Sequence, residues 1–287
     1  GQAVAHEGRG PIRADPALAA HGLSLDLVAP PDTEPARVEA RSFQTWPEEV
    51  AAIADRIVEL HDTGAVADWS QIAVLGRRNS QVAAVYAALA ERDVPAEIVG
   101  LGGLLELPIV TEVVATLTLL DDPAANPAAI SLLTSPRWAI GLPDLALLGR
   151  RAQELVGDSA ERPSLLEAAA DLGGAGFSQA ARQRLSRFAR EFQGLRRHAA
   201  DPVPELVSRV IATLGSVVEA EVAVRGGSRP LARFVQAVSE YADIDAEAGL
   251  SGLLAYLAAE REYGTGLEQG LPSRPDAVQV LTVHKAK

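Results

Sequence analysis

Residues 71–80 read Gln-Ile-Ala-Val-Leu-Gly-Arg-Arg-Asn-Ser, and this stretch decides the fold class. The uninterrupted apolar run from Ile72 to Leu75 is typical of a strand that is buried on both faces of a parallel sheet. Ser80 is a favourable residue for capping a helix. The next apolar residues follow at helical spacing: Val82, Val85, Tyr86 and Leu89. The stretch therefore predicts a strand followed closely by a helix, with Arg77 between them.

The flanking sequence extends this alternation in both directions. Upstream, Val38 to Phe43 predicts a strand, and Thr45 to Glu48 provides a capping box for a helix that should run to about His61. Downstream, Asp93-Val94-Pro95 should end the second helix before a further strand, Ala96 to Val99. The resulting β-α-β-α-β order predicts an α/β fold with a doubly wound parallel sheet and right-handed crossovers.

A long helical region follows. Ile109 to Leu120 predicts a helix, and no strand pattern appears for roughly the next 150 residues. Further helices are expected near residues 127–134, 143–156, 164–171, 178–198, 203–214, 231–241 and 250–263. Ala277 to Val283 then returns to a buried strand pattern. Because a lone strand must pair with another, we expect one sheet that is interrupted by a helical insertion.

Composition limits the classes of function. The chain has 287 residues, of which 48% are apolar, so it can bury at least one full core. The net charge of −12 repels phosphate, so any contact with nucleic acid must be local. The lack of cysteine excludes disulfides and thiolate chemistry, and the five histidines show no metal-binding spacing. No apolar run is long enough to cross a bilayer and no signal peptide is visible, so we expect a soluble, cytoplasmic protein.

The N-terminal region and the lack of methionine indicate an incomplete polypeptide. Residues 1–35 are rich in Gly, Pro, Ala and Asp with little periodicity, which predicts a loosely ordered lead-in segment. Methionine is absent even at position 1, which favours a fragment of a longer protein. The alternative is that methionines are missing from the sequence as written, in which case some adjacent residues would not be true neighbours.

No complete phosphate-binding loop is visible. The sequence lacks both G-x-x-x-x-G-K-[ST] and a strand followed by G-x-G-x-x-G. Gly100-Leu-Gly102-Gly103 follows a predicted strand but lacks the third glycine at the required spacing, so we interpret it as a turn. The chain is therefore not expected to bind a nucleotide by itself.

Two groups of polar residues follow predicted strands. Arg77 lies just beyond one strand, and Thr282-Val-His-Lys-Ala-Lys287 lies at the end of another. Ligands of parallel sheets bind at the carboxyl ends of the strands, where a guanidinium can bond two phosphate oxygens. The Thr, His and Lys donors suit a nucleic-acid backbone. The alternatives are a solvated loop around Arg77 and a terminal segment that only improves solubility.

Two features of the helical region leave alternatives open. Ser135 to Gly141 joins two predicted helices and forms either a plain structural hairpin or a helix N-terminus that binds phosphate, with Trp138 as a packing residue. The predicted helix at 178–198 carries six arginines against one glutamate, Glu191. Its charged face is either solvated or a patch that follows a DNA duplex.

Read in order, three segments resemble superfamily 1 DNA helicases of the UvrD/Rep/PcrA kind. Residues 71–80 resemble motif IV, and Val278 to Lys287 resembles motif V. Between them, the segment from Leu104 to Leu117 is similar to the lead into the 2B insertion, and Ser135 to Gly141 is similar to its Arg-Gly-Ile-Gly element. Motor subunits of actinobacterial recombination helicase-nucleases are the most similar variety.

The resemblance implies a domain organisation and a function. Residues 36–120 and 272–287 would form a partial RecA-like parallel sheet domain (2A), which an all-helical insertion (2B, residues 121–271) interrupts. The whole protein would be an ATP-dependent DNA helicase or translocase that couples ATP hydrolysis to strand separation in DNA repair or recombination. ATP would be held mainly by a first RecA-like domain of the same polypeptide, and the intact enzyme would use ATP together with Mg²⁺.

The resemblance also implies roles for individual residues. Arg77 would contact the γ-phosphate of ATP as a catalytic residue. Thr282, His284 and Lys287 would contact single-stranded DNA. The backbone of a DNA duplex would be approached by Ile140 and Gly141.

The sequence departs from the family pattern in several places. Gly76 replaces the aromatic residue of motif IV, and Ala139 stands where the first glycine of the insertion element belongs. Because both Walker motifs are missing, the chain alone is expected neither to hydrolyse ATP nor to unwind DNA. Two alternatives remain, namely a non-enzymatic α/β scaffold that binds a partner and a helical module that binds duplex DNA through residues 135–141.

Overall fold

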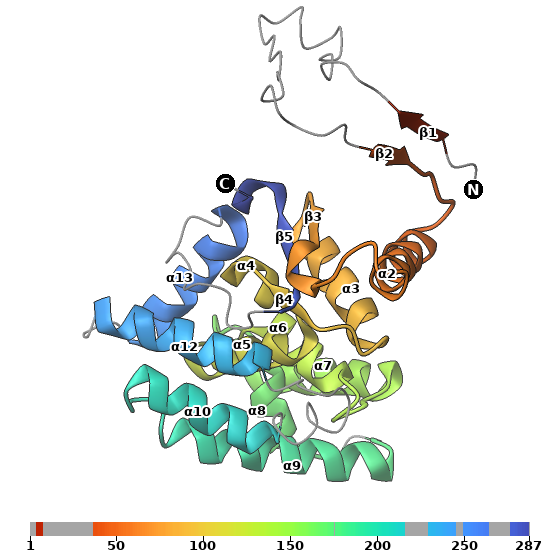
Figure 1. The fold of residues 1–287 in the computed structure, drawn as a ribbon. Helices are drawn as coiled ribbons and strands as arrows, with labels where there is room; N and C mark the ends of the chain where they lie inside the picture. The colour runs from red at the N-terminus through yellow and green to blue at the C-terminus, as the bar shows by residue number, and fades with distance from the viewer. Residues whose placement is uncertain are drawn as a thin grey trace, which may run out of the picture. The chain divides into compact units, whose positions relative to one another are not determined.

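The chain is a mixed α/β protein in which helix predominates (Figure 1). It divides into two compact units, residues 1–55 and 56–287. None of the described helices combines the length and the apolar character that a membrane crossing requires. The computed structural model describes residues 4–7, 37–174, 176–215, 229–244, 249–263 and 276–286.

The first unit contains a two-stranded antiparallel sheet. Strand β1 (Val4–Glu7) pairs with β2 (Arg37–Ala40). The prediction that Val38 to Phe43 opens the parallel sheet is therefore wrong, because alternation indicates a strand but does not identify its partner. Residues 4–7 also form a strand inside the segment for which little regular structure was expected, and residues 8–36 of that segment lie outside the described residues.

Helix α2 (Trp46–Asp62) begins at the predicted capping box. The Glu48 N–H donates to Thr45 Oγ1 over 3.4 Å, and the Thr45 N–H donates to Glu48 Oε2 over 3.3 Å. These two bonds satisfy backbone donors that a helix start leaves free. The helix ends one residue beyond the predicted His61, so this prediction is confirmed.

A three-stranded parallel sheet lies in the second unit. Its strands are β3 (Ala73–Gly76), β4 (Ala96–Ile98) and β5 (Val278–Thr282), in the spatial order β3-β5-β4. The C-terminal strand thus lies in the centre and pairs with both of the others. The prediction that this strand joins strands from the early part of the chain is confirmed.

Strand β3 is less buried than its sequence indicates. Within the described residues it is an edge strand of this sheet, Ala73 is exposed, and Leu75 is 48% exposed. The prediction of a strand covered on both faces is therefore wrong for the described sheet. An apolar run shows that a strand can be buried, but it does not distinguish a central position from an edge.

Helix α3 (Asn79–Ala90) packs against all three strands. The sequence predicts Ser80 as its cap, but the N-cap position is occupied by Arg78. The capping acceptor is instead Gln81, whose Oε1 accepts hydrogen bonds from the N–H groups of Arg77 and Arg78 at 3.0 and 3.1 Å. Gln81, at the third position of the helix, therefore provides the capping interaction that was predicted for Ser80.

The glycine-rich stretch after β4 forms a short helix and not the predicted turn. Helix α4 (Leu101–Leu104) starts after Gly100. A Cβ atom on Gly103 would lie 2.6 Å from Cγ2 of Ile98, so only glycine allows α4 to pack this closely against β4. The sequence interpretation of these glycines as a turn is therefore wrong, because Gly103 instead allows α4 to pack closely against β4.

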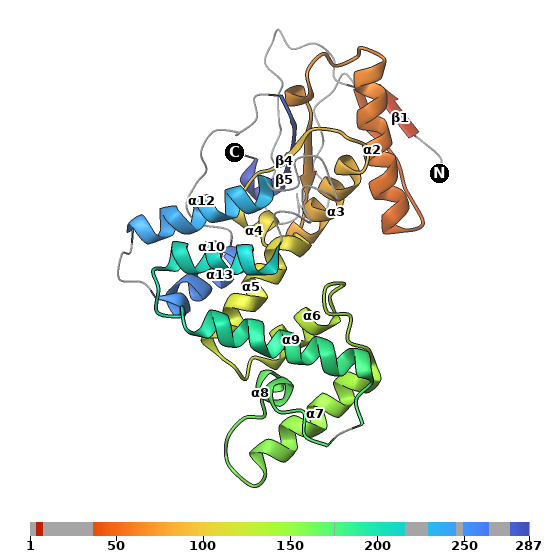
Figure 2. The ribbon, with the colours of Figure 1, turned by 90° about the horizontal axis from the view of Figure 1, so that it is seen from below.

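The long helical region is confirmed within the described residues, where each helix end lies within three residues of its predicted position. Its helices are α5 (Pro108–Asp121), α6 (Asn126–Thr134), α7 (Leu142–Val156), α8 (Leu165–Ala170), α9 (Gln179–Arg196), α10 (Val203–Leu214), α12 (Arg229–Ile244) and α13 (Leu250–Tyr263). Helix α8 packs against α6, α7 and α9, whereas α10, α12 and α13 pack against α5 (Figures 1 and 2). Helices α12 and α13 also contact α4, beside the sheet.

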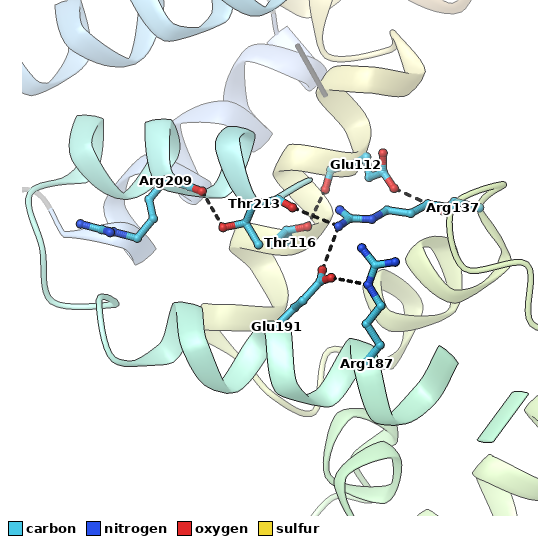
Figure 3. A network of polar contacts seen from close by, with 8 residues as sticks. Glu112, Thr116, Arg137, Arg187, Glu191, Arg209 and Thr213 are labelled. Carbon is cyan, nitrogen blue, oxygen red and sulfur yellow. Dashed lines mark hydrogen bonds and ion pairs between the residues drawn. The ribbon is translucent and has the colours of Figure 1, made fainter. Parts of the chain in front are cut away.

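A polar network fixes the loop between α6 and α7 (Figure 3). Arg137 Nη2 donates to Glu191 Oε2 of α9 over 2.9 Å and to the carbonyl oxygen of Thr213 over 3.0 Å. Arg187 donates to the other oxygen of Glu191 over 2.8 Å. The neighbouring Trp138 is 3% exposed and lies under the Arg137 guanidinium, so it is a packing residue as predicted. One arginine thus ties this loop to two helices.

We expect Arg137→Ala to destabilise the fold strongly. The substitution removes a largely buried cation and leaves Glu191 with one partner, which should lower the free energy of unfolding by about 2–3 kcal/mol. The matched control is Arg162→Ala, which removes an ion pair with Asp122 in which Arg162 is 71% exposed, and it should cost less than about 1 kcal/mol. Urea denaturation of both variants checks this, and equal losses would contradict it.

Candidate functional site

The carboxyl ends of β3 and β5 lie side by side. Gly76, the last residue of β3, is paired with Thr282, the last residue of β5. Arg77 follows the first of these strands directly, and His284 lies in the short 3-10 helix η2 (Val283–Lys285) after the second. The structure therefore places Arg77, Thr282 and His284 at one edge of one sheet.

These three residues line a common cavity of about 440 Å³. The β3–α3 turn contributes Arg77 and Arg78, and η2 contributes Lys285. Glu106 also lines the cavity, as does Arg261 of α13, which the sequence analysis did not single out. The cavity thus draws on four separate parts of the chain.

The cavity carries an excess of positive charge. Its lining includes four permanent cations, Arg77, Arg78, Arg261 and Lys285, and two carboxylates, Glu106 and Glu262. Arg261 Nε lies 2.9 Å from Glu106 Oε1, so one cation and one carboxylate neutralise each other. In a protein with a net charge of −12, this local excess favours an anionic ligand.

Arg77 is held by its backbone and has a free side chain. Its N–H donates to Gln81 Oε1 over 3.0 Å, which fixes the start of the turn. Its side chain is exposed and forms no ion pair with any of the described residues. A fixed backbone with an unpaired guanidinium is suited to binding the oxygens of a phosphate.

Glycines let three helices converge on the wall of the cavity. A Cβ atom on Gly102 would lie 2.6 Å from Asn79 Nδ2 and 3.3 Å from the carbonyl oxygen of Glu260. Gly100 has a φ of +95°, and the side chain of Lys285 passes over it. The pair of glycines at 102 and 103 was a signal of this close packing, whereas no feature of the sequence indicated that α13 would supply Arg261.

The segment Ser135 to Gly141 does not line this cavity. Ile140 is 4% exposed, so its side chain is buried and a duplex contact here would have to use the exposed backbone of Gly141. Ala139 has a φ of +44°, the left-handed region that favours glycine, and its carbonyl oxygen accepts a hydrogen bond from Arg184 over 2.8 Å. Lys287, the other residue expected at DNA, lies outside the described residues.

The described part of the chain offers no metal site of its own. No three carboxylate or imidazole side chains come together there in a way that could hold an ion. A comparison with protein-family models gives no match for this chain, and a comparison with curated proteins gives none either. Function must therefore be inferred from the chemistry of the cavity.

Gly102→Ala should distort the cavity wall. The added methyl group would overlap the Asn79 amide and press on α13, which should lower the free energy of unfolding by about 1–3 kcal/mol. The matched control is Gly149→Ala in α7, where a Cβ meets no atom within 4 Å, and it should raise stability by up to about 1 kcal/mol. Urea denaturation distinguishes the two, and a neutral Gly102→Ala would disprove the predicted overlap.

Ala139→Gly should stabilise the loop before α7. Glycine adopts a φ of +44° without the steric cost that alanine bears, so stability should rise by about 1 kcal/mol. The control is Ala146→Gly at an exposed position inside α7, where the same substitution should cost about 1 kcal/mol. Thermal unfolding should shift in opposite directions for the two variants, and a shift in the same direction would refute the prediction.

Proposed function

We propose that this chain is part of an ATP-dependent DNA helicase or translocase that acts in the cytoplasm in DNA repair or recombination. Residues 36–120 and 272–287 would belong to its partial RecA-like domain, and residues 121–271 to a helical insertion. The observation that carries the proposal is the shared sheet edge, where Arg77 lies beside the segment that contains Thr282 and His284. A motor needs its phosphate contact and its DNA contact to be mechanically joined.

In this proposal Arg77 is the catalytic residue. ATP would be held mainly by a first RecA-like domain of the same polypeptide, and Arg77 would approach the γ-phosphate from the other side. Its guanidinium would stabilise the negative charge that develops on the phosphoryl oxygens, a contribution of roughly 10³ or more in rate. In the intact enzyme Mg²⁺ would accompany ATP and neutralise part of the phosphate charge.

The contact with DNA would come from the end of β5 and the segment that follows it. The hydroxyl of Thr282, the imidazole of His284 and the ammonium of Lys287 would hold the backbone of a single strand. Because Gly76 and Thr282 are register partners in neighbouring strands, a displacement of Arg77 would move the DNA contact with it. Closing and reopening of the two RecA-like domains would thereby move these contacts along the single-stranded DNA.

Arg77→Ala in the intact polypeptide should abolish most ATP hydrolysis. We expect the turnover number at saturating single-stranded DNA to fall by roughly 10³, with Arg77→Lys retaining only part of the activity because it lacks the planar fork. The control is Arg150→Ala, an exposed arginine of α7 outside the cavity, which should leave turnover unchanged.

Two results would count against the motor. Unchanged turnover for Arg77→Ala would dismiss its catalytic role. ATP hydrolysis by the 287-residue chain alone would contradict the assignment of the main ATP site to a separate domain.

A further inference from the structure

The outward face of α9 has an unusual composition. With 100° of rotation per residue, one stripe of this helix lies opposite the buried residues Leu185, Phe188 and Phe192. All of its members are exposed, and all are arginine, glutamine or serine: Gln179, Arg182, Gln183, Ser186, Arg190 and Gln193, with Arg197 at the C-cap of the helix. We call this set the α9 stripe.

The α9 stripe contains no carboxylate, although the chain has 38 acidic residues. Neither Arg190 nor Arg197 forms an ion pair with any of the described residues, and Arg190 Nε donates to the carbonyl oxygen of Ser186 in its own helix. The one acidic residue of α9, Glu191, lies outside the stripe and forms ion pairs with Arg137 and Arg187. The stripe is therefore a local row of hydrogen-bond donors and positive charge on an acidic protein.

Helix α9 packs against α8, α10 and α5, and none of the other described elements lies in front of it in the view of Figure 2. A groove of about 480 Å³ runs between α8 and α9 along the stripe, and Ser186, Arg190 and Gln193 line its α9 side. The only carboxylate among the groove residues, Glu167, lies 3.7 Å from Arg196.

Length and chemistry favour duplex DNA as the occupant. Helix α9 has 18 residues and is about 27 Å long, which corresponds to roughly eight base-pair steps of a duplex. Arginine, glutamine and serine donate to phosphate oxygens without reading the sequence. Binding of a single strand normally uses aromatic side chains for base stacking, and none of the stripe residues is aromatic.

We propose that the α9 stripe binds the phosphate backbone of duplex DNA without sequence preference. This inference rests on the proposed function for the identity of its partner, and it assigns the duplex contact to a different place from Ile140, whose side chain is buried. Arg190 and Arg197 are its principal phosphate contacts, because both are exposed cations that form no ion pair with the described residues.

The test is binding of the 287-residue chain to a fluorescent duplex of about 30 base pairs, long enough to cover the stripe, across a salt series. The double variant Arg190→Gln/Arg197→Gln should weaken binding about tenfold or more and reduce the slope of log K against log salt by about two. The control Arg150→Gln/Arg162→Gln removes the same charge from exposed positions outside the stripe, and it should leave both quantities unchanged.

Several outcomes would overturn the proposal. They are a double variant that behaves like the control, equal affinity for a single strand of the same length, and equal affinity for polyglutamate. Single variants at Arg190 and Arg197 provide a second measurement, each with a slope reduced by about one. Failure here is distinguishable from failure of the motor proposal, because Arg77→Ala tests ATP turnover and leaves the α9 stripe intact.

Discussion

The backbone hydrogen bonds of β5 hold the functional edge of the molecule together. Strands β3 and β4 do not pair with each other in the described sheet, and each is joined to the fold through β5. Val278 and Val280 are fully buried in this central strand. The cavity at the carboxyl edge exists because β5 brings Thr282 beside Gly76 and carries η2 over Gly100. In the proposed motor, this pairing would couple phosphate chemistry to DNA binding.

Positive charge is distributed unevenly over this acidic protein. The chain as a whole repels nucleic acid, and positive charge is concentrated in the cavity and along α9. In each place one carboxylate that would weaken an anion site is paired with arginine, Glu106 with Arg261 and Glu191 with Arg137. Arg77 in the cavity and Arg190 and Arg197 of the α9 stripe form no ion pair with the described residues and are available to a ligand. Local clusters of this kind allow an acidic protein to bind a polyanion at chosen positions.

Sequence patterns predicted which segments are regular, but not how they assemble. Helices such as α10 and α13 were located correctly because their apolar spacing depends only on local geometry. The position of β3 at an edge and the pairing of β2 with β1 depend on distant segments, which periodicity does not report. The same distinction holds for the site. Arg77 and Thr282 could be predicted from their strands, whereas Arg261 reaches the cavity only through the packing of α13 on α4.

The central position of β5 has a consequence for biosynthesis. About 180 residues separate the end of β4 from the start of β5, and all of them leave the ribosome before the sheet can close. At typical translation rates this interval lasts on the order of ten seconds or more. During that time the nascent β3 and β4 segments lack their hydrogen-bonding partner. Chaperone capture in the cell would therefore fall on these early strands while the intervening helices are being made.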